Sequence, residues 1–200
     1  MALVLGLGNP GSRYARTRHN VGWRVVERLV RRWGAAPAGE HEAWRAWRAE
    51  RGGVAVDLLV PLTFMNDSGE ALEAWREHHA FDPAALLVVV DDVYLPLGRL
   101  RLRAAGSSGG HHGLESLERA VGPEFARLRI GVGAAPEAGT LRDHVLEEFE
   151  EHERMAADEA LERAADAVEC WLAEGLLAAM NRFNHRTGYP PEAGPEENES

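Results

Sequence analysis

The sequence predicts an α/β fold: a single domain with a twisted, mostly parallel (mixed) central sheet flanked by helices. Short apolar runs alternate along the chain with longer segments in which apolar residues recur at helical spacing. The most apolar run, 86–90, has no polar residue, which is typical of a strand buried on both faces. A length of 200 residues suits one domain with a substantial core.

The elements follow from local patterns. Residues 2–6 form an apolar run ended by glycines, which predicts a first strand, and the polar segment 8–18 predicts a loop. In 21–33 the apolar residues recur every three or four positions, as in an amphipathic helix. Arginine and leucine alternate in 99–103, which predicts a strand with one wet, basic face. By the same criteria we expect strands at 42–49, 54–60, 86–90 and 128–132, and helices at 70–79, 114–121, 153–173 and 175–184.

Composition excludes several classes of protein. No run of 18 apolar residues is present, so no membrane span is expected. The N-terminus lacks the basic region of a signal peptide, and the single Cys170 excludes an intrachain disulfide. These features predict a cytoplasmic protein. Residues 189–200 are rich in Pro, Glu and Asn, which predicts a disordered acidic tail after a domain spanning 1–188.

The net charge of −10 is unevenly distributed. Residues 147–200 hold 15 acidic and 4 basic residues, so the rest of the chain is close to neutral. All 22 basic residues are arginine, whose planar guanidinium suits phosphate contacts. The charge pattern therefore permits a nucleic-acid partner without predicting one.

Three further interpretations are not supported by the sequence around the residues that suggest them. Residues 6–11 match the G-x-G-x-x-G dinucleotide motif, but helical periodicity begins about ten residues too late for it. Residues 106–110 match the G-x-S-x-G nucleophile elbow around Ser108, but they follow a half-exposed strand instead of a buried one. The nine histidines show no metal-ligand spacing, so no metal site is expected.

A dispersed set of polar residues follows the predicted strands: Asn9, His19, Asn20, Asn66, Asp91, Asp92, His111 and His112. In open α/β sheets the ligand crevice lies outside the carboxyl ends of the strands. A histidine, a carboxylate and side-chain amides that converge there can act as base, orienting group and oxyanion donors for hydrolysis. Taken singly, each residue is better explained as a cap or turn residue, so spacing alone does not choose between the two interpretations.

A series of motifs resolves this ambiguity. They run in order from residue 3 to about 184: 5–11 (LGLGNPG) with Tyr14, 17–22 (TRHNVG), 61–69 (PLTFMNDSG), 89–98 (VVDDVYLPLG), 106–114 (GSSGGHHGL), 125–133 (FARLRIGVG), 145–149 (VLEEF) and 180–184 (MNRFN). This series resembles the bacterial peptidyl-tRNA hydrolases. The resemblance implies hydrolysis of the ester between a peptide and the 3′ ribose of tRNA, by a monomer that needs no metal or organic cofactor.

The resemblance also implies catalytic roles. His19 is expected to act as general base on a water molecule, since a histidine of ordinary pKa is suited to this at neutral pH. Asp91 is expected to hold the imidazole in the productive tautomer and to stabilise its charged form. Asn9 and Asn66 are expected to position water and the peptide carbonyl, with the Asn66 amide as an oxyanion donor.

Further residues are implied in substrate binding. Tyr14 and Met65 are expected to line the cleft, and Arg103 and Arg129 to contact the phosphates of the tRNA. His112 stands where the family usually has asparagine, and an imidazole cannot reproduce an amide's pair of hydrogen bonds. His112 is the main departure from the family pattern, and it bears on how the substrate is positioned.

A non-catalytic RNA-binding protein on the same fold is the alternative. The family includes a chloroplast splicing factor that resembles the enzymes and binds intron RNA through a partner. The complete set of Asn9, His19, Asn66 and Asp91 favours the enzyme, as does the lack of a plastid transit peptide. His112 is the one feature that favours the alternative.

Overall fold

A seven-stranded sheet organises the computed structural model, which describes residues 1–135 and 140–184. The strands lie in the order β2-β3-β4-β1-β5-β7-β6. Their bounds are β1 Ala2–Gly6, β2 Ala36–Glu40, β3 Trp44–Arg51, β4 Val54–Pro61, β5 Leu86–Asp92, β6 Leu100–Arg103 and β7 Ala126–Gly131. The helices are α1 Val21–Trp33, α2 Ser68–Arg76, α3 His112–Val121, α4 Leu141–Leu146, α5 Arg154–Glu174 and α6 Leu176–Phe183, with 3₁₀ turns η1 Ser12–Tyr14, η2 Arg18–Asn20, η3 Met65–Asp67 and η4 Pro83–Ala85.

The predicted α/β fold class is confirmed, with a sheet more evenly mixed than expected. The four central strands β4, β1, β5 and β7 are mutually parallel, while β2, β3 and β6 each run antiparallel to their neighbours. A two-residue turn at Gly52-Gly53 joins β3 to β4, and so short a connection permits only antiparallel pairing. The parallel strands therefore form the centre, where their carboxyl ends share one edge.

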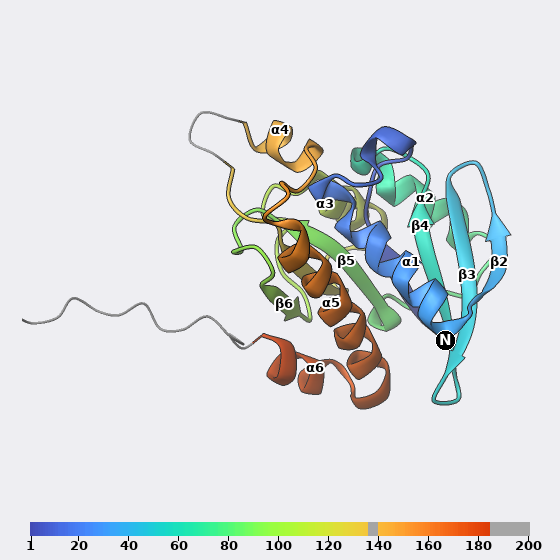
Figure 1. Cartoon of the computed structure of the whole chain (residues 1–200). Helices are drawn as coiled ribbons and strands as arrows, with labels where there is room; N and C mark the ends of the chain where they lie inside the picture. The colour runs from blue at the N-terminus through green and yellow to red at the C-terminus, as the bar shows by residue number, and fades with distance from the viewer. Residues whose placement is uncertain (136–139, 185–200) are drawn as a thin grey trace, which may run out of the picture.

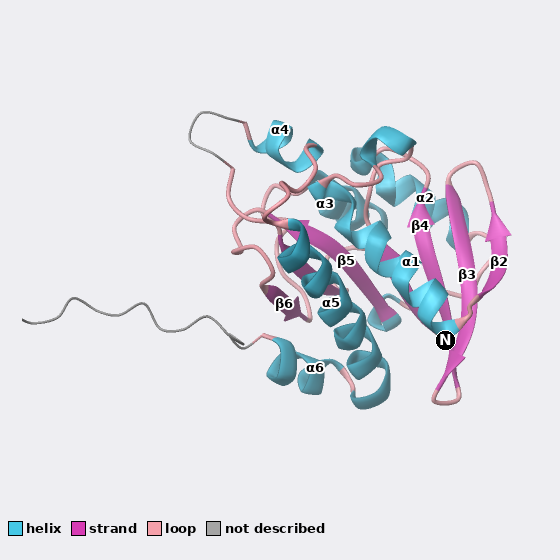
Figure 2. Ribbon diagram, viewed as in Figure 1, coloured by secondary structure: helices cyan, strands magenta, loops and turns pink. Residues whose placement is uncertain are grey.

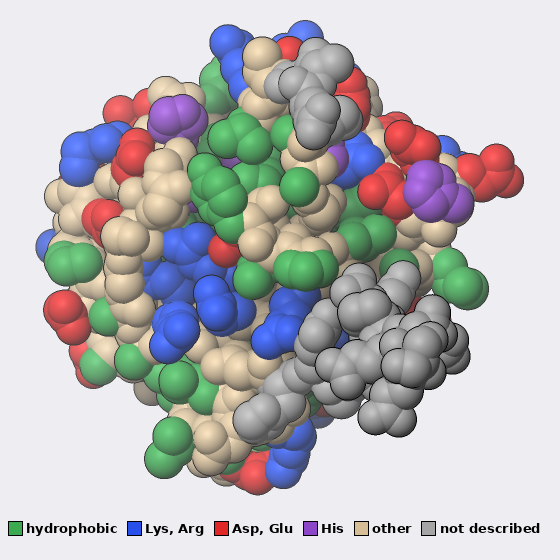
Figure 3. Space-filling view, turned by 90° about the vertical axis from the view of Figure 1, so that its left-hand side faces the viewer, with side chains coloured by type: hydrophobic (Ala, Val, Ile, Leu, Met, Phe, Trp, Pro, Cys, Tyr) green, Lys and Arg blue, Asp and Glu red, His purple; other side chains and the backbone are tan. Residues whose placement is uncertain are grey.

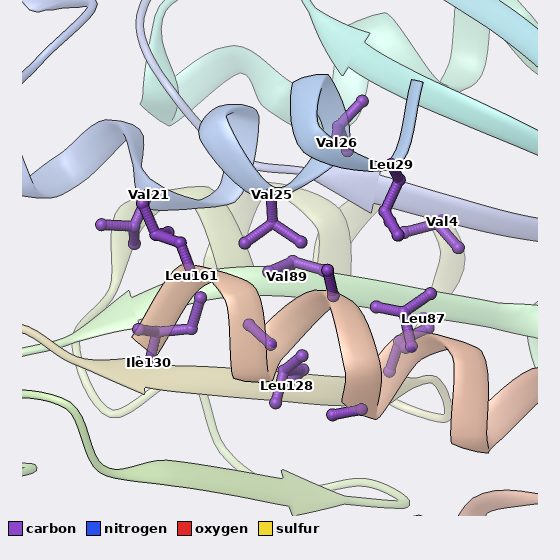
Figure 4. Packing of buried hydrophobic residues seen from close by; sticks show 14 of the residues in the cluster. Val4, Val21, Val25, Val26, Leu29, Leu87, Val89, Leu128, Ile130 and Leu161 are labelled. Atoms are coloured by element: carbon purple, nitrogen blue, oxygen red, sulfur yellow. The ribbon is translucent and has the colours of Figure 1, made fainter. Parts of the chain in front are cut away.

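Helices cover both faces of this sheet (Figures 1 and 2). Helices α1 and α5 pack on one face, and α2 and α3 on the other. Along β5, Leu87 and Val89 point toward α1 and α5, whereas Val88 and Val90 pack on the opposite side. Figure 4 shows the first of these cores, in which Val25 of α1 lies against Val89 and near Leu161 of α5. Burial of β5 on both faces agrees with its uninterrupted apolar sequence.

The start of α1 lies unusually close to the sheet. A Cβ atom added to Gly6 would fall 2.4 Å from the carbonyl oxygen of Gly22, so this approach requires glycine. The Trp23 backbone N–H donates to the Leu7 carbonyl at 3.2 Å. This contact brings η2, the turn just before α1, to the carboxyl edge of the parallel strands.

Two short elements were not predicted. Strand β2 contains Pro37 and Gly39, which hide its strand pattern, and α4 is only six residues long. The predicted tail 189–200 lies outside the described residues and stays a prediction. Within residues 1–135 and 140–184, no helix has the length and apolar character needed to cross a bilayer.

Candidate active site

Two histidines meet one buried carboxylate at the carboxyl edge of the sheet. Asp91, at the end of β5, is only 2% exposed. Its Oδ1 and Oδ2 both lie 2.9 Å from Nδ1 of His19, which η2 carries. Its Oδ1 also lies 2.9 Å from Nε2 of His111, the residue just before α3. The imidazole rings are 5.0 Å apart between centroids. Residues far apart in sequence thus form one hydrogen-bonded cluster.

The hydrogen bonds assign a tautomer to each ring. Nδ1 of His111 accepts from the Leu114 backbone N–H at 3.3 Å, so the ring proton of neutral His111 is on Nε2 and is donated to Asp91. His19 donates from Nδ1, which leaves its Nε2 unprotonated. His19 lines the cleft, so Nε2 is the nitrogen available to accept a proton there.

The charges of this cluster shift the pKa values of His19 and Asp91 in opposite directions. Burial alone would lower the pKa of His19, but the charge of Asp91 and its hydrogen bond outweigh burial and raise that pKa above 6.5. Burial alone would raise the pKa of Asp91, yet its interactions with His19 and His111 hold that pKa far below its usual range. Asp91 therefore stays ionised and favours the imidazolium form of His19.

The same three residues bring ligand-type atoms within 4.8 Å of one another, close enough for a metal ion. The hydrogen bond from Leu114 argues against that use. A metal on Nε2 of His111 would place the ring proton on Nδ1, which would break the hydrogen bond that Nδ1 accepts from Leu114. The observed contacts satisfy the cluster as hydrogen bonds, and the prediction of a metal-independent site stands as a prediction.

Asn9 is held rigidly beside this cluster. The side chain of Asn20 accepts from the Asn9 N–H and donates to the Asn9 carbonyl, both at 2.9 Å. The Asn9 side-chain oxygen accepts from the Met65 N–H at 2.9 Å, which joins the loop after β1 to η3 after β4. The oxygen is thus occupied, and the group that Asn9 can offer to the cleft is its amide NH₂.

A cleft of about 870 Å³ opens over these residues. Every catalytic residue predicted from the sequence lines it: Asn9, His19, Asn66 and Asp91. So do the predicted substrate-binding residues Tyr14, Met65, His112 and Arg129, but not Arg103. Asn66 is exposed and donates to Asp67 at 2.7 Å. His112 is largely exposed at the first position of α3, with Nδ1 3.3 Å from Glu115.

Comparison with known proteins then identifies the family. A family model described as peptidyl-tRNA hydrolase matches residues 3–190. The chain belongs to the peptidyl-tRNA hydrolase family. A protein of that name from Synechococcus sp. (strain JA-3-3Ab) is 48% identical over 189 residues, covering 92% of this chain and 83% of its own. Another from Chloroflexus aggregans is 47% identical over 186 residues, covering 92% of this chain and 99% of its own.

Solved structures agree with this membership. A crystal structure of peptidyl-tRNA hydrolase from Acinetobacter baumannii superimposes with a TM-score of 0.86 at 34% identity, covering 92% of this chain and 94% of the other. The predicted enzyme class, a hydrolase, is thereby confirmed. The assignment of individual residues to steps of the reaction rests on the geometry described above.

The arginines of this family member occupy different environments. On edge strand β6, Arg101 and Arg103 are exposed while the alternating Leu100 and Leu102 are buried, as the alternation predicted. Arg103 pairs across the ladder with Arg127, and Arg101 with Arg129. Arg129 is partly buried and donates to Asp92 and to two backbone carbonyls. Figure 3, viewed from the side of β6 and α4, shows arginine side chains gathered near the centre of this face.

The structure also explains the rejected motifs. Helix α1 begins at Val21, so residues 6–11 do not open a helix. Loop residues 104–111 separate β6 from α3, so Ser108 does not occupy a strand-to-helix elbow. The Ser108 hydroxyl lies 3.4 Å from a Glu115 carboxylate oxygen and 3.3 Å from the Gly110 N–H. Neither contact activates it as a nucleophile.

Sequence reasoning did not assign a role to His111. It chose the adjacent His112, which is the more exposed of the two. One available signal was its place three residues before the helix predicted at 114–121, where a side-chain acceptor can cap the first turn. The contributions of Phe64, Tyr94 and the α4 residues Leu141, Arg142, Val145 and Leu146 to the cleft wall were also missed.

Proposed function

We propose that the cleft hydrolyses the ester of peptidyl-tRNA, with Nε2 of His19 as the general base. The observation that carries the proposal is the bond from His19 Nδ1 to the buried Asp91, because it fixes the ring and leaves Nε2 as the free acceptor. The raised pKa of His19 makes it a stronger base than a free histidine. No serine or cysteine nucleophile is part of the proposed mechanism.

The proposed reaction is a direct attack by water. Nε2 of His19 removes a proton as the water oxygen bonds to the ester carbonyl carbon, and the carbonyl oxygen takes up the negative charge. The amide NH₂ groups of Asn9 and Asn66 are the proposed donors to that oxyanion. Collapse of the intermediate breaks the bond to the tRNA 3′ oxygen, which leaves with the proton from the His19 imidazolium. The products are a free peptide carboxyl group and a free tRNA hydroxyl.

Asp91 and His111 support this proton transfer without taking the proton. The Asp91 carboxylate stabilises the imidazolium that forms on His19. His111 occupies one oxygen of Asp91 as a neutral donor, so the carboxylate keeps a fixed orientation. The two rings thus have different proposed roles: His19 has a free nitrogen at the cleft, whereas both nitrogens of His111 are hydrogen-bonded within the protein.

Substrate binding is proposed to combine the cleft with the basic face of β6. The peptide end would enter among Tyr14, Met65 and the neighbouring apolar wall, with His112 at the rim. Arg103 and Arg129 are the proposed phosphate contacts, supplying affinity that does not depend on sequence. All these residues come from one chain, so a monomer is the proposed working unit. We expect it to act in the cytoplasm, where its substrate arises.

A labelled N-acylated aminoacyl-tRNA tests the proposal directly. The wild-type protein should release the acylated amino acid, and His19→Ala should reduce the rate by on the order of 10²–10⁴ while the fold survives. The matched control is His78→Ala, at an exposed histidine in the bend after α2, and it should retain the wild-type rate. tRNA binding without hydrolysis by the wild type would instead support the non-catalytic RNA-binding alternative.

A further inference from the structure

The loop that precedes α3 is held by hydrogen bonds from arginine side chains to its backbone carbonyls. We call residues 106–110 the glycine loop; it belongs to no helix or strand. Three consecutive carbonyls of this loop accept hydrogen bonds from two arginines of β7. Arg127 Nη1 donates to Gly106 O at 2.5 Å, and Arg129 Nη2 donates to Ser107 O at 2.8 Å and to Ser108 O at 3.2 Å. The course of the loop is therefore defined by guanidinium groups.

Arg127 is placed for an internal role. Its side chain is 1% exposed, so a bound nucleic acid cannot reach it. Besides the glycine loop, it contacts Glu118 of α3 at 3.1 Å and the Pro123 carbonyl at 2.9 Å, and its guanidinium lies 4.4 Å from the ring centroid of Phe125. A buried charge is stabilised when its donors are used. These acceptors use both Nη groups of Arg127, whereas its buried Nε has no hydrogen-bond partner among the described residues. Arg127 thus joins β7, α3 and the glycine loop.

Arg129 extends the same support toward the cleft. Its Nη1 donates to Asp92 at 3.1 Å, and Asp92 is the neighbour of Asp91 at the end of β5. Because β5 and β7 are adjacent parallel strands, Arg129 ties the glycine loop to the strand that carries the catalytic carboxylate. A guanidinium can do this because its donors diverge in one plane toward several acceptors.

The glycine loop leads directly into His111. The Ser108 carbonyl, which Arg129 holds, also accepts the backbone N–H of His111 at 3.2 Å. His111 in turn caps α3 and donates to Asp91. An uninterrupted chain of contacts thus runs from the two arginines of β7, through the loop carbonyls, to the oxygen of Asp91 that His19 shares.

We propose that Arg127 and Arg129 are positioning residues that hold the glycine loop so that His111 can donate to Asp91. This role differs from phosphate binding, to which Arg127 has no access. Its effect on turnover rests on the proposed function of His19 and Asp91, whereas its effect on His111 does not.

Lysine variants separate positioning from charge. Lysine keeps the positive charge but has a single ammonium group, which cannot reproduce the guanidinium's spread of donors. We therefore choose Arg127→Lys and Arg129→Lys, each also combined with His111→Ala. Two quantities are measured: the pH dependence of kcat/KM on N-acylated aminoacyl-tRNA, and the ¹⁵N chemical shifts of the histidine rings.

The expected result is a displaced His111 and a shifted pH profile. When His111 no longer donates to Asp91, the carboxylate charge acts more strongly on His19, so the acid limb of kcat/KM moves to higher pH, by on the order of half a unit. The rate at neutral pH should fall about tenfold because the cluster loses its geometry. The ¹⁵N shift of His111 Nε2 should change in both lysine variants. In the His111→Ala background, neither lysine substitution should move the acid limb further.

The other charged and titratable groups of the cleft are unaltered in the single lysine variants. They are Asp91, Asp92, Glu115, His111, His112 and Arg142. Arg48→Lys serves as the matched control: Arg48 pairs with the buried Asp57 through two hydrogen bonds, at 2.6 and 2.8 Å, outside the cleft. It should lower stability and leave both the acid limb and the His111 shift as in wild type.

Several outcomes would overturn the proposal. One is an unchanged His111 ¹⁵N shift and acid limb in the lysine variants, with only weaker tRNA binding. Another is an equal shift in Arg48→Lys, which would reduce the effect to general stability. If Arg127→Lys does not fold, the less buried Arg129→Lys decides. If His19→Ala proves active, the proposed function fails, and the His111 shift still decides whether the arginines position the loop.

Discussion

Two groups of ion pairs in this protein use the same chemistry in opposite surroundings. Along the outside of the molecule, three arginines of α1 alternate with three acids of α5 in a ladder: Arg24, Arg28 and Arg32 with Asp158, Glu162 and Asp166. The side chains of these acids are between 52% and 57% exposed. At the cleft, one carboxylate, Asp91, is 2% exposed and serves two histidines.

The difference lies in redundancy. In the ladder, Asp158 and Glu162 are each shared by two arginines, and water can replace any contact that is lost. Asp91 has no such substitute, because burial removes water and both histidines depend on the same group. Exposed pairs should therefore tolerate substitution, while the buried cluster should not.

Of the four predicted effects, the loss of rate in Asp91→Asn should be the largest. An amide cannot stabilise the imidazolium form of His19, and its NH₂ group would oppose one of two ring N–H donors. The rate on N-acylated aminoacyl-tRNA should fall by on the order of 10³–10⁴. Steady-state kinetics, with circular dichroism to verify folding, provide the measurement. A loss of rate below tenfold would mean that the buried cluster tolerates substitution as the exposed ladder is expected to.

The pH dependence of the wild type should report the same cluster. Because the pKa of His19 is raised above 6.5, more than half of its imidazole is protonated at that pH, and kcat/KM should rise with a midpoint above that value. The corresponding stability has the opposite sense: His19 stabilises the fold below pH 6.5, and this contribution disappears as pH rises through its higher folded pKa. A pH–rate profile with its midpoint at or below 6.5 would contradict the influence assigned to Asp91.

Arg103→Ala should have a smaller effect, confined to binding. Arg103 is exposed on edge strand β6 and outside the cleft, so its removal should leave the chemical step unchanged. We expect tRNA affinity to fall and the slope of log K against log salt to flatten by about one unit. Binding titrations at several salt concentrations measure this slope. An unchanged slope would leave Arg103 as a solubilising charge.

Glu162→Gln should have the smallest effect. It removes contacts to Arg28 and Arg32, but both arginines keep a second acidic partner. We expect a loss below about 1 kcal/mol in the free energy of unfolding and no change in turnover. Urea denaturation and the hydrolysis assay are the two measurements. A loss of several kcal/mol would mean that the exposed ladder is not redundant.

The sequence predicted elements with strong local patterns well. The helix expected at 21–33 coincides with α1, because its apolar stripe faces the sheet along its whole length. The convergence of His19 and Asp91 was also predicted, since both follow the general rule for the edge of a parallel sheet. The resemblance to a family supplied the roles that spacing alone left open.

What the sequence concealed depends on contacts between distant segments. The part played by His111 requires Asp91, 20 residues away in sequence, and a hydrogen bond from Leu114 in the first turn of α3. Arg127 and Arg129 read alike in the sequence, yet the end of α3 and the glycine loop bury the first almost completely. No local pattern encodes such burial.

The turn that carries His19 has a further consequence for the order in which the protein acquires activity during synthesis. Buried Arg18 donates to the Glu148 carbonyl and to the Glu153 carboxylate at 2.6 Å, the second across 135 residues, and its backbone N–H donates to Glu147. Nascent chains emerge from the N-terminus at roughly 5–20 residues per second. His19, the proposed base, is among the first twenty residues made, but its turn lacks these contacts until residue 153 has left the ribosome. We therefore expect hydrolysis only after that point of synthesis.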